Sequence, residues 1–426
     1  MDARWKPVTV SDLRIGQYLR IGHRWFDHPF VLGTFRITSD SEIAIIREAQ
    51  LTRLFIDPDR SVAETSNVIT DQVATTGISE LEAVTDIVAY SARLQDEKAA
   101  HAETVQRQRR LFDQVQQNYH NAVGDSTDVQ RLLGEGDVDA TSRATELVNR
   151  VLQAGEDCDC PLSFAGADQP VDLAQRLSRQ SLDAVAIAGV VGRKMNLGKA
   201  DMSILALSAL THGVGIERLP EALRDESLLV DRSDLLEYQH YPILSARILR
   251  GCDGMPAEVE QIVAKHRERL DGNGFPEGLE GDLQPLSRLV GVIREFLSMT
   301  RGIKAVMPAA ALAHIYRNLR TAYGGDVVDP LVAALTVYPP GSFLELTDGS
   351  IGRVIRVSES DRMRPTVCLF DDTVTPAEAD IVNLATTRSV RVQRVLDPQG
   401  LERGVIDFFG GDRWSGLTLS NPLLPV

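Results

Sequence analysis

The sequence predicts a mainly α-helical protein with a small α+β domain at its N-terminal end and a small β appendage near its C-terminal end. Between residues 136 and 335, apolar residues recur at helical spacing and strand-like alternation is absent. After Tyr338-Pro-Pro-Gly341 the pattern changes to period two, which indicates short strands. Residues 1–61 mix strand and helix signals. The predicted parts are therefore residues 1–61, 62–135, 136–335 and 338–397, followed by a tail at 398–426.

Composition limits the classes of function. The 426 residues suffice for two to four domains, and a formal net charge of −15 argues against a surface for a nucleic-acid polymer or an anionic membrane. No run of about 18 apolar residues predicts a membrane span, and the N-terminal residues lack the apolar core of a signal peptide. We therefore expect a cytoplasmic protein. Cys158 and Cys160 lack a second Cys or His pair at zinc-site spacing, so reduced thiols are expected.

The N-terminal part reads as a small α+β domain. Apolar residues between 10 and 19, and again between 28 and 37, predict strands, with Gly33 at a hairpin turn. Ser39 followed by Glu42 predicts a capped helix start, and residues 54–57 predict a closing strand. His23 and His28 have no nearby carboxylate or cysteine companions, so packing or surface roles are expected rather than metal ligation.

Residues 61–80 lack periodicity and predict a linker, and residues 82–123 predict one long helix. Val105, Phe112 and Tyr119 recur every seven residues along it, but fewer than four clean heptads are visible. Two interpretations stay open: a connecting helix packed on its own domain, or a helix that forms a homodimer. The run 124–128, which begins with Gly124, is expected to end this helix.

In the central part the sequence predicts a series of helices, interrupted by a polar loop at 155–169. The expected helices span residues 140–152, 181–195, 201–211, 234–250, 256–270, 286–300 and 308–323. The helix 181–195 is apolar almost all round and should be buried. Strands are expected at 343–346, 352–357, 366–370 and 388–396, with Asp348-Gly349 as a turn. Apolar residues in the tail are expected to dock on a neighbouring element.

One stretch organises the central part: His266-Arg-Glu-Arg-Leu-Asp-Gly-Asn-Gly-Phe-Pro276. Its first half continues a helical apolar face through Ile262, and its second half is a glycine-rich helix breaker. The stretch resembles the signature His-His-Glu-x-x-Asp-Gly-x-Gly-Tyr-Pro of the HD-GYP family, bacterial phosphohydrolases of the HD superfamily that cleave cyclic di-GMP. The resemblance implies an HD-type helical fold for 136–335. The N-terminal domain resembles one often fused to HD-GYP domains.

The resemblance also implies a centre of two or more divalent metals, with ligands from four segments. Six positions of this chain match ligand positions of the family: His212, Gly213, Tyr241, His266, Arg267 and Arg294. Only the two histidines keep the family residue, and they could hold iron or manganese weakly at best. A guanidinium about 4 Å from a dication costs roughly 8 kcal/mol at an effective dielectric near 20. No residue is therefore assigned as catalytic, and no metal is expected.

These losses predict a degenerate member of the family, inactive or nearly inactive as a phosphodiesterase. It would bind cyclic di-GMP or a partner signalling protein of the diguanylate-cyclase type. The alternative is a metal-dependent cyclic di-GMP phosphodiesterase with a rearranged ligand set, and a third interpretation is an interaction protein without nucleotide affinity. Arg267 and Arg294 either form internal ion pairs, with Glu268, Asp271 or Glu295 as local candidates, or hold a phosphodiester.

The loop after His266 keeps more of the family pattern than the metal ligands do. We identify one set of residues as a candidate ligand or partner loop: Asp271, Gly272, Gly274, Phe275, Pro276 and Arg288. Phe275 keeps an aromatic ring that could stack on a guanine but has no hydroxyl. The other interpretation is that the loop anchors the following helix in the core.

Overall fold

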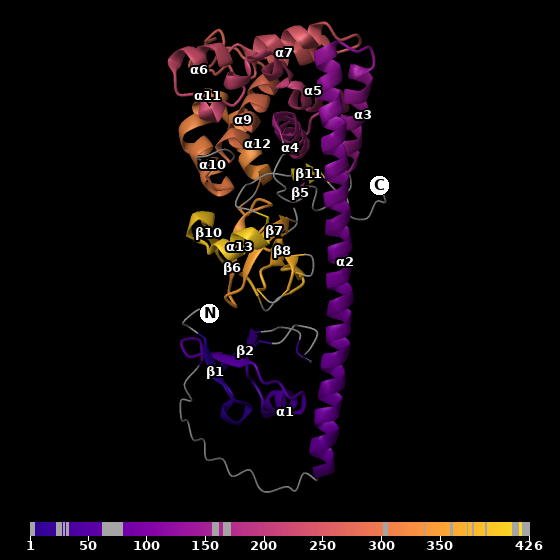
Figure 1. Cartoon of the computed structure of the whole chain (residues 1–426), viewed down its shortest axis with the longest axis vertical. Helices are drawn as coiled ribbons and strands as arrows, with labels where there is room; N and C mark the ends of the chain where they lie inside the picture. Colours follow the sequence, from indigo (N-terminus) through magenta and orange to yellow (C-terminus); the bar gives the residue numbers. More distant parts are fainter. Residues whose placement is uncertain are drawn as a thin grey trace. The chain divides into compact units, whose positions relative to one another are not determined.

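The computed structural model (Figure 1) describes residues 5–410 and 417–419, apart from 23–27, 29, 31–33, 62–79, 156–161, 165–171, 301–305, 336, 358–360, 373, 377–378 and 388–389. The predicted linker and the Cys158/Cys160 pair thus lie outside the described residues. The chain forms two compact units, residues 1–108 with 371–378, and residues 109–370 with 379–426. Each unit is described separately.

The N-terminal domain is a four-stranded antiparallel sheet and one helix. Its strands are β1 (Lys6–Val8), β2 (Tyr18–Ile21), β3 (Thr34–Arg36) and β4 (Leu54–Asp57), in the order β1-β4-β2-β3, with α1 at Asp40–Glu48. The predicted helix start is confirmed, because Ser39 and Glu42 form a reciprocal capping box. β3 pairs with β2, and the hairpin predicted at Gly33 lies mostly outside the described residues. His28 is buried, with its ring 6.3 Å from that of Phe30.

The long helix α2 runs from Glu80 to Glu135, so the predicted end at residues 124–128 is wrong. Packing overrides local propensity here, since Val129 and Leu133 are buried in the helical core beyond the glycine. Val115 and Tyr119 are also buried, and the Tyr119 hydroxyl donates to the Asp183 carboxylate at 3.1 Å.

From Val115 onward α2 therefore packs on its own domain, as one of the two interpretations proposed. Phe112 packs against the buried cluster that contains Ile355 and Cys368, which belong to the C-terminal sheet described below. The side chain of Val105 is not described, so a homodimer through the earlier part of the helix stays a prediction.

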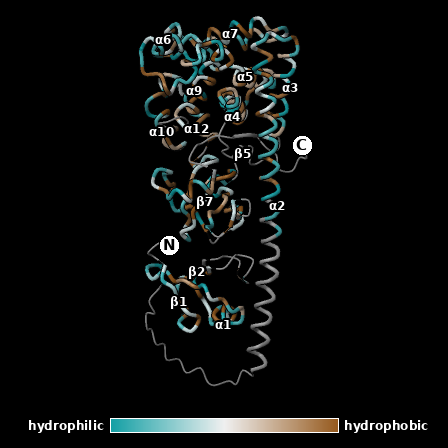
Figure 2. The backbone as a smooth tube through the Cα atoms, in the orientation of Figure 1, coloured by the Kyte–Doolittle hydropathy of each residue, from teal (hydrophilic) through white to brown (hydrophobic). Residues whose placement is uncertain are grey.

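The helical domain confirms the mainly α class. Its elements are α3 (Ala140–Gln153), α4 (Leu173–Lys194), α5 (Lys199–Thr211), α6 (Arg232–Tyr238), α7 (Tyr241–Arg250), α8 (Ala257–Lys265), α9 (Pro285–Met299), α10 (Pro308–His314), α11 (Arg320–Tyr323) and α12 (Gly325–Leu335). α4 is buried along most of its length and packs against α3, α5, α9 and α12 near the middle of the array (Figure 1). The backbone coloured by hydropathy shows both apolar and polar residues along these helices (Figure 2).

Several predicted helix boundaries in this domain are wrong, among them the start at residue 181, since α4 begins at Leu173. Residues 234–250 form two helices, because a new helix begins at Tyr241 with Pro242 in its first turn. The helix predicted for 256–270 ends at Lys265, and His266 is its C-cap residue. α12 was not predicted, and a π-helical turn, Ile315–Leu319, interrupts the helix predicted for 308–323.

The C-terminal strands β6 (Phe343–Leu346), β7 (Ile351–Arg356), β8 (Thr366–Leu369), β9 (Ile381–Asn383) and β10 (Val392–Leu396) form an antiparallel sheet. Gly349 in the predicted turn has φ 85°, a conformation that favours glycine. β7 also pairs with β5 (Leu162–Phe164), which in turn pairs with β11 (Leu417–Leu419). The segments predicted as a polar loop and a tail thus contribute strands to one sheet, and the tail also holds α13 (Arg403–Phe408).

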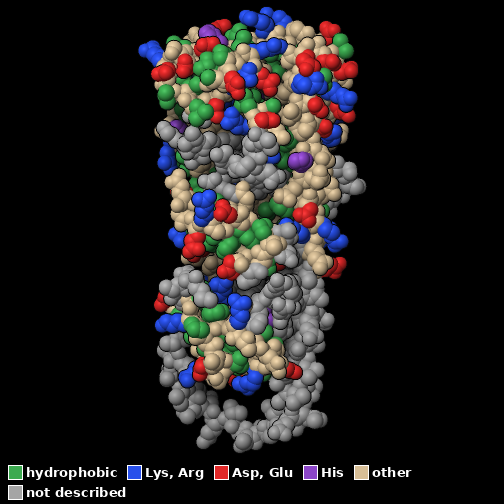
Figure 3. Space-filling view, viewed as in Figure 1, with side chains coloured by type: hydrophobic (Ala, Val, Ile, Leu, Met, Phe, Trp, Pro, Cys, Tyr) green, Lys and Arg blue, Asp and Glu red, His purple; other side chains and the backbone are tan. Residues whose placement is uncertain are grey.

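The described helices include none that is both long and apolar enough to cross a membrane. On the face shown in Figure 3, acidic and basic side chains are interspersed over the helical domain rather than gathered by sign. Of the four cysteines, Cys252 and Cys368 fall within the described residues, and both are free and buried.

Candidate functional site

The ends of three helices bring together the histidines that the sequence singled out. His212 is the C-cap residue of α5, His266 is the C-cap residue of α8, and Tyr241 begins α7. The rings of His212 and His266, hereafter the histidine pair, have centroids 5.4 Å apart, and all three side chains are buried. The close approach of α9 to this point requires Gly291, since a Cβ there would lie 2.2 Å from the His266 carbonyl oxygen.

Hydrogen bonds determine the tautomer of each histidine. The Nδ1 atom of His212 lies 2.8 Å from the Ala209 carbonyl oxygen, and that of His266 lies 2.6 Å from the Val263 carbonyl oxygen. A carbonyl oxygen only accepts, so each Nδ1 carries a proton. The Tyr241 hydroxyl then donates to Nε2 of His266 at 2.8 Å. This bond uses the lone pair with which His266 would bind a metal.

Burial keeps both imidazoles neutral. Loss of hydration lowers the pKa of His212 to about 4, and the positive charges of Arg294 and Arg267 add to that shift. The pKa of His266 is also held well below its ordinary value, first by burial and then by His212. Neither ring can take up a proton near neutral pH without loss of folding free energy.

We expect the free energy of unfolding to fall as the pH drops from about 6.5 to about 4. In this range the unfolded state binds a proton at position 212 and the folded state does not, so acidification favours unfolding. Multiplying the shift by 1.36 kcal/mol per pKa unit gives about 3 kcal/mol for His212, and His266 acts in the same direction. Urea unfolding at pH 7.5, 5.5 and 4.5 measures the effect.

The His212→Asn variant should show a flatter dependence of unfolding free energy on pH than the wild type. His240→Asn is the matched control, because the His240 side chain is exposed at the start of α7. If the unfolding free energy changes with pH equally steeply in the wild type and in His212→Asn, His212 is not the source of the pH dependence.

The two arginines at family ligand positions share one carboxylate that the sequence pattern does not predict. This residue is Glu226, in the short 3₁₀ turn Glu226–Leu228 between α5 and α6. Its carboxylate lies 3.4 Å from Nη2 of Arg267 and 3.0 Å from Nη2 of Arg294. Tyr238 donates its hydroxyl to the same carboxylate at 3.3 Å. We call Arg267, Arg294 and Glu226 the arginine–glutamate cluster.

The arginines of the cluster are buried, and their charges dominate its electrostatics. Arg267 and Arg294 have side chains 7% and 6% exposed, whereas the Glu226 side chain is 29% exposed. Burial raises the pKa of the Glu226 carboxyl, but attraction to the two guanidiniums outweighs burial and leaves the pKa below its ordinary value. Glu226 is therefore a carboxylate at neutral pH, and it compensates one of two buried positive charges.

The predicted partners of the arginines are corrected in part. Glu295 lies 4.0 Å from Nη2 of Arg267 but is closer to Arg269, at 3.4 Å. Glu268 does not pair with the arginines: its buried carboxylate accepts the Glu277 and Leu279 N–H groups at 2.7 and 2.9 Å. The exposed Asp271 accepts the Asn273 N–H at 3.1 Å.

The candidate loop is tied to the cluster through one residue. The Arg267 guanidinium lies 4.8 Å from the centre of the Phe275 ring, which is 6.4 Å from the Tyr241 ring. Gly274 permits the loop to pass close to the chain, since a Cβ there would lie 2.4 Å from the Arg269 nitrogen. Gly272 has φ 70°, and the bond between Phe275 and Pro276 is cis. The loop thus brings one aromatic ring to the arginines.

Arg288, the last residue of the candidate set, has a different place. Its guanidinium binds the Asp326 carboxylate at 2.6 and 2.8 Å, and also donates to the Leu283 and Tyr323 carbonyl oxygens. These bonds engage all three of its nitrogens. Arg288 therefore holds the start of α12 against α9 and has no donor nitrogen left over for a ligand.

The residues present do not fit a two-metal centre. Gly213 supplies no side-chain donor, Tyr241 occupies Nε2 of His266, and Arg267 and Arg294 bring positive charge to the remaining ligand positions. In the part of the chain that the structure describes, no group of three or more His, Cys, Asp or Glu side chains is arranged to hold a metal ion. His240 does not replace Tyr241, since its side chain is exposed.

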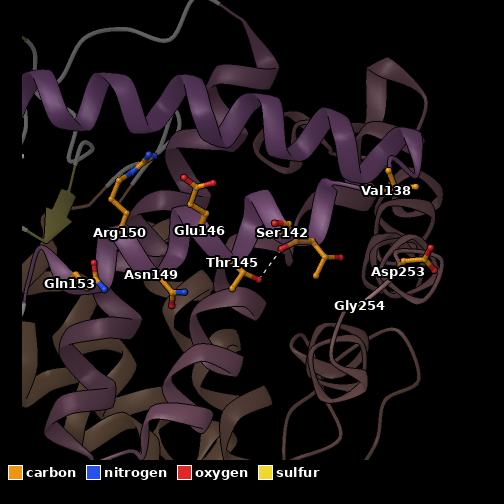
Figure 4. Close-up of a pocket in the computed structure, with 10 residues that line it drawn as sticks. Val138, Ser142, Thr145, Glu146, Asn149, Arg150, Gln153, Asp253 and Gly254 are labelled. Carbon is orange, nitrogen blue, oxygen red and sulfur yellow. Dashed lines mark hydrogen bonds between the residues drawn. The ribbon is translucent and has the colours of Figure 1, made fainter.

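An open groove of about 790 Å³ lies elsewhere, along α3 (Figure 4). Its lining includes Thr145, Glu146 and Asn149 of α3 with Asp253 from the turn after α7. None of its lining residues belongs to the histidine pair or to the arginine–glutamate cluster. The groove therefore does not contribute to the candidate site.

Comparison with protein families agrees with this architecture. Residues 5–144 match a domain of unknown function, DUF3391; residues 167–327 match the HD domain; and residues 343–404 match a KOW domain associated with the HD domain. The chain is therefore an HD-domain protein with a DUF3391 domain at its N-terminal end.

Several curated relatives are cyclic dinucleotide phosphodiesterases. A cyclic di-GMP phosphodiesterase of Pseudomonas aeruginosa is 21% identical over 86% of this chain and 85% of its own length. A cyclic di-GMP phosphodiesterase response regulator of Xanthomonas campestris pv. campestris is 29% identical over 34% of this chain and 40% of its own. A solved HDG"Y"P protein from Bdellovibrio bacteriovorus is 15% identical, with a TM-score of 0.41 over 77% of this chain and 98% of its own.

Proposed function

We propose that this chain is a cytoplasmic HD-GYP-type signalling protein that is inactive or nearly inactive as a phosphodiesterase and acts by binding cyclic di-GMP. The observation that carries the proposal is the arginine–glutamate cluster, which stands where hydrolysis would require metal ligands. A guanidinium about 4 Å from a dication costs roughly 8 kcal/mol at an effective dielectric near 20. Two such charges exclude the metal from a site that retains two isolated imidazoles.

The proposed ligand is supported by the groups that remain. Guanidiniums bind phosphodiesters through charge-assisted hydrogen bonds, and the Phe275 ring beside Arg267 can stack on a base. The names of the relatives in Pseudomonas and Xanthomonas state that they act on cyclic di-GMP. A partner signalling protein of the diguanylate-cyclase type is the second candidate, with the Asp271 loop as its contact surface.

We expect the purified protein to contain no stoichiometric metal and to leave cyclic di-GMP intact when manganese or iron is added. Elemental analysis and chromatography of the nucleotide measure this, with the Pseudomonas relative as the active control. Hydrolysis that disappears in both the His212→Ala and the His266→Ala variants would establish the alternative, an enzyme with a rearranged ligand set. Calorimetric titration with cyclic di-GMP tests binding directly. If the titration gives no heat and a high concentration of cyclic di-GMP does not raise the melting temperature, binding of a partner protein becomes the proposed function.

A further inference from the structure

The two arginines of the cluster are incompletely paired. The Nη1 atom of Arg267 and the Nε and Nη1 atoms of Arg294 are buried without a hydrogen-bond partner among the described residues. A buried donor that has lost water and gained no partner costs about 1–3 kcal/mol. Three such donors within one cluster are therefore a large uncompensated cost, and they point to an acceptor that completes the site.

Arg288 shows what a purely structural arginine looks like in the same fold. It is buried to a similar degree, 8% exposed, yet its carboxylate contact is bidentate and its other donors reach carbonyl oxygens. Arg267 and Arg294 instead each reach Glu226 through a single nitrogen, at 3.4 and 3.0 Å. In this arrangement Glu226 engages one nitrogen of each guanidinium and leaves the other nitrogens of both forks to find acceptors elsewhere.

We propose that Arg267 and Arg294 form a binding site for a phosphate group, and that Glu226 occupies this site as a displaceable internal carboxylate. Inorganic phosphate and phosphomonoesters offer more unesterified oxygens than a carboxylate, so they can engage nitrogens that Glu226 leaves unpaired. A phosphodiester offers two, as a carboxylate does, but its tetrahedral geometry directs them differently from the planar Glu226 group. The site takes a phosphomonoester, a phosphodiester or inorganic phosphate. This inference rests on the proposed function for the choice of a nucleotide phosphodiester as the natural ligand.

The position of Glu226 makes displacement feasible. Its side chain is 29% exposed, so it lies between the buried arginines and solvent. The turn that carries it is only three residues long, and the neighbouring side chains Leu228 and Val230 are 58% and 88% exposed. The chain is held on both sides of Glu226, because Asp225 pairs with Arg176 at 2.6 Å and Leu229 packs against the buried cluster that contains Tyr238. When a phosphate replaces Glu226, the Glu226 side chain therefore turns toward solvent while its neighbours stay in place.

The test removes the internal competitor. We expect Glu226→Gln to lower the melting temperature in chloride and to restore it in inorganic phosphate at equal ionic strength. The phosphate concentration that gives half of this stabilisation should be at least tenfold lower than for the wild type. Asp329→Asn is the matched control, because it removes a carboxylate from Arg320 in an exposed pair. That variant should respond to phosphate as the wild type does.

Adding Arg294→Met to Glu226→Gln should abolish the response to phosphate. An unchanged half-stabilising concentration in Glu226→Gln would overturn the proposal, since solvent water would then be the partner of the unpaired donors. If Glu226→Gln does not fold, Glu226→Asp replaces it. Its shorter carboxylate cannot span both guanidiniums, and phosphate should stabilise it at lower concentration than the wild type. An unchanged concentration in Glu226→Asp would overturn the proposal equally.

Titration with cyclic di-GMP separates this inference from the proposed function. Tighter binding of both phosphate and cyclic di-GMP by Glu226→Gln supports both. Tighter binding of phosphate, with no binding of cyclic di-GMP by either protein, keeps the anion site and removes the proposed ligand. Binding of cyclic di-GMP by the wild type, with no gain in affinity for either ligand in Glu226→Gln, keeps the function and removes the anion site.

Discussion

A chain that carries Gly213→Asp, Tyr241→His, Arg267→His and Arg294→Asp together is expected to bind manganese, whereas the wild type does not. These substitutions supply the ligands that the HD-GYP pattern requires beside the histidine pair. Position 213 has room, because a Cβ there would meet its nearest neighbour, the Ile216 Cδ1 atom, at 3.5 Å. Replacing Tyr241 frees Nε2 of His266, and replacing both arginines removes two buried positive charges.

The expected change is from no bound manganese to at least one ion per chain, measured by elemental analysis after gel filtration. Ligand binding to the folded state alone should also raise stability by about 2.7 kcal/mol at a hundredfold excess over the dissociation constant, and chelator should reverse it. The matched control omits Arg294→Asp, so one guanidinium still opposes the ion. Circular dichroism shows whether the quadruple variant folds. If it folds but binds no manganese, restoring the four ligands is not sufficient to rebuild a metal centre.

Glu268→Ala is expected to destabilise the protein by about 3 kcal/mol, a value typical of two buried N–H groups left without acceptors. Glu268 is 1% exposed, and its carboxylate accepts the Glu277 and Leu279 N–H groups of the glycine-rich loop. Asp271→Ala removes a carboxylate from the same loop. Asp271 is exposed and accepts one hydrogen bond, from Asn273, so the change should stay near 0.5 kcal/mol.

Urea unfolding monitored by circular dichroism compares the two variants at pH 7.5. Glu268→Ala should also weaken binding at the cluster, since the loop carries Phe275 to the Arg267 guanidinium. Equal destabilisation by the two substitutions would mean that the loop is held by its backbone geometry rather than by the buried carboxylate.

Local pattern sufficed for much of the fold. The helices predicted at 181–195 and 201–211 are present within α4 and α5, because their apolar periodicity and their burial agree. The capped start of α1 and the turn at Gly349 were likewise readable from residues a few positions apart. The long helix did not end at Gly124, since the buried residues beyond it outweigh a local penalty of about 1 kcal/mol.

The candidate site, like the fold, was only partly predictable from the sequence. The six positions that match ligand positions of the HD-GYP pattern, four of them with a different residue, were found by comparing the sequence with that pattern. The carboxylate that meets the two arginines was not, because Glu226 is 41 residues from Arg267 and 68 residues from Arg294. A buried guanidinium needs a hydrogen-bond acceptor, but the sequence does not indicate which of the chain's carboxylates supplies it.

The sequence by itself determined the helical class, the loop after His266 and the departures from the HD-GYP ligand pattern, since each depends on residue types at short spacing. Tertiary structure alone decided which groups meet. It paired β5 with β11 from distant parts of the chain, placed Tyr241 on His266, and set Glu226 between two guanidiniums that it only partly satisfies. The physical reason is that periodicity reports which face of an element is buried, whereas contacts between elements depend on how those faces pack.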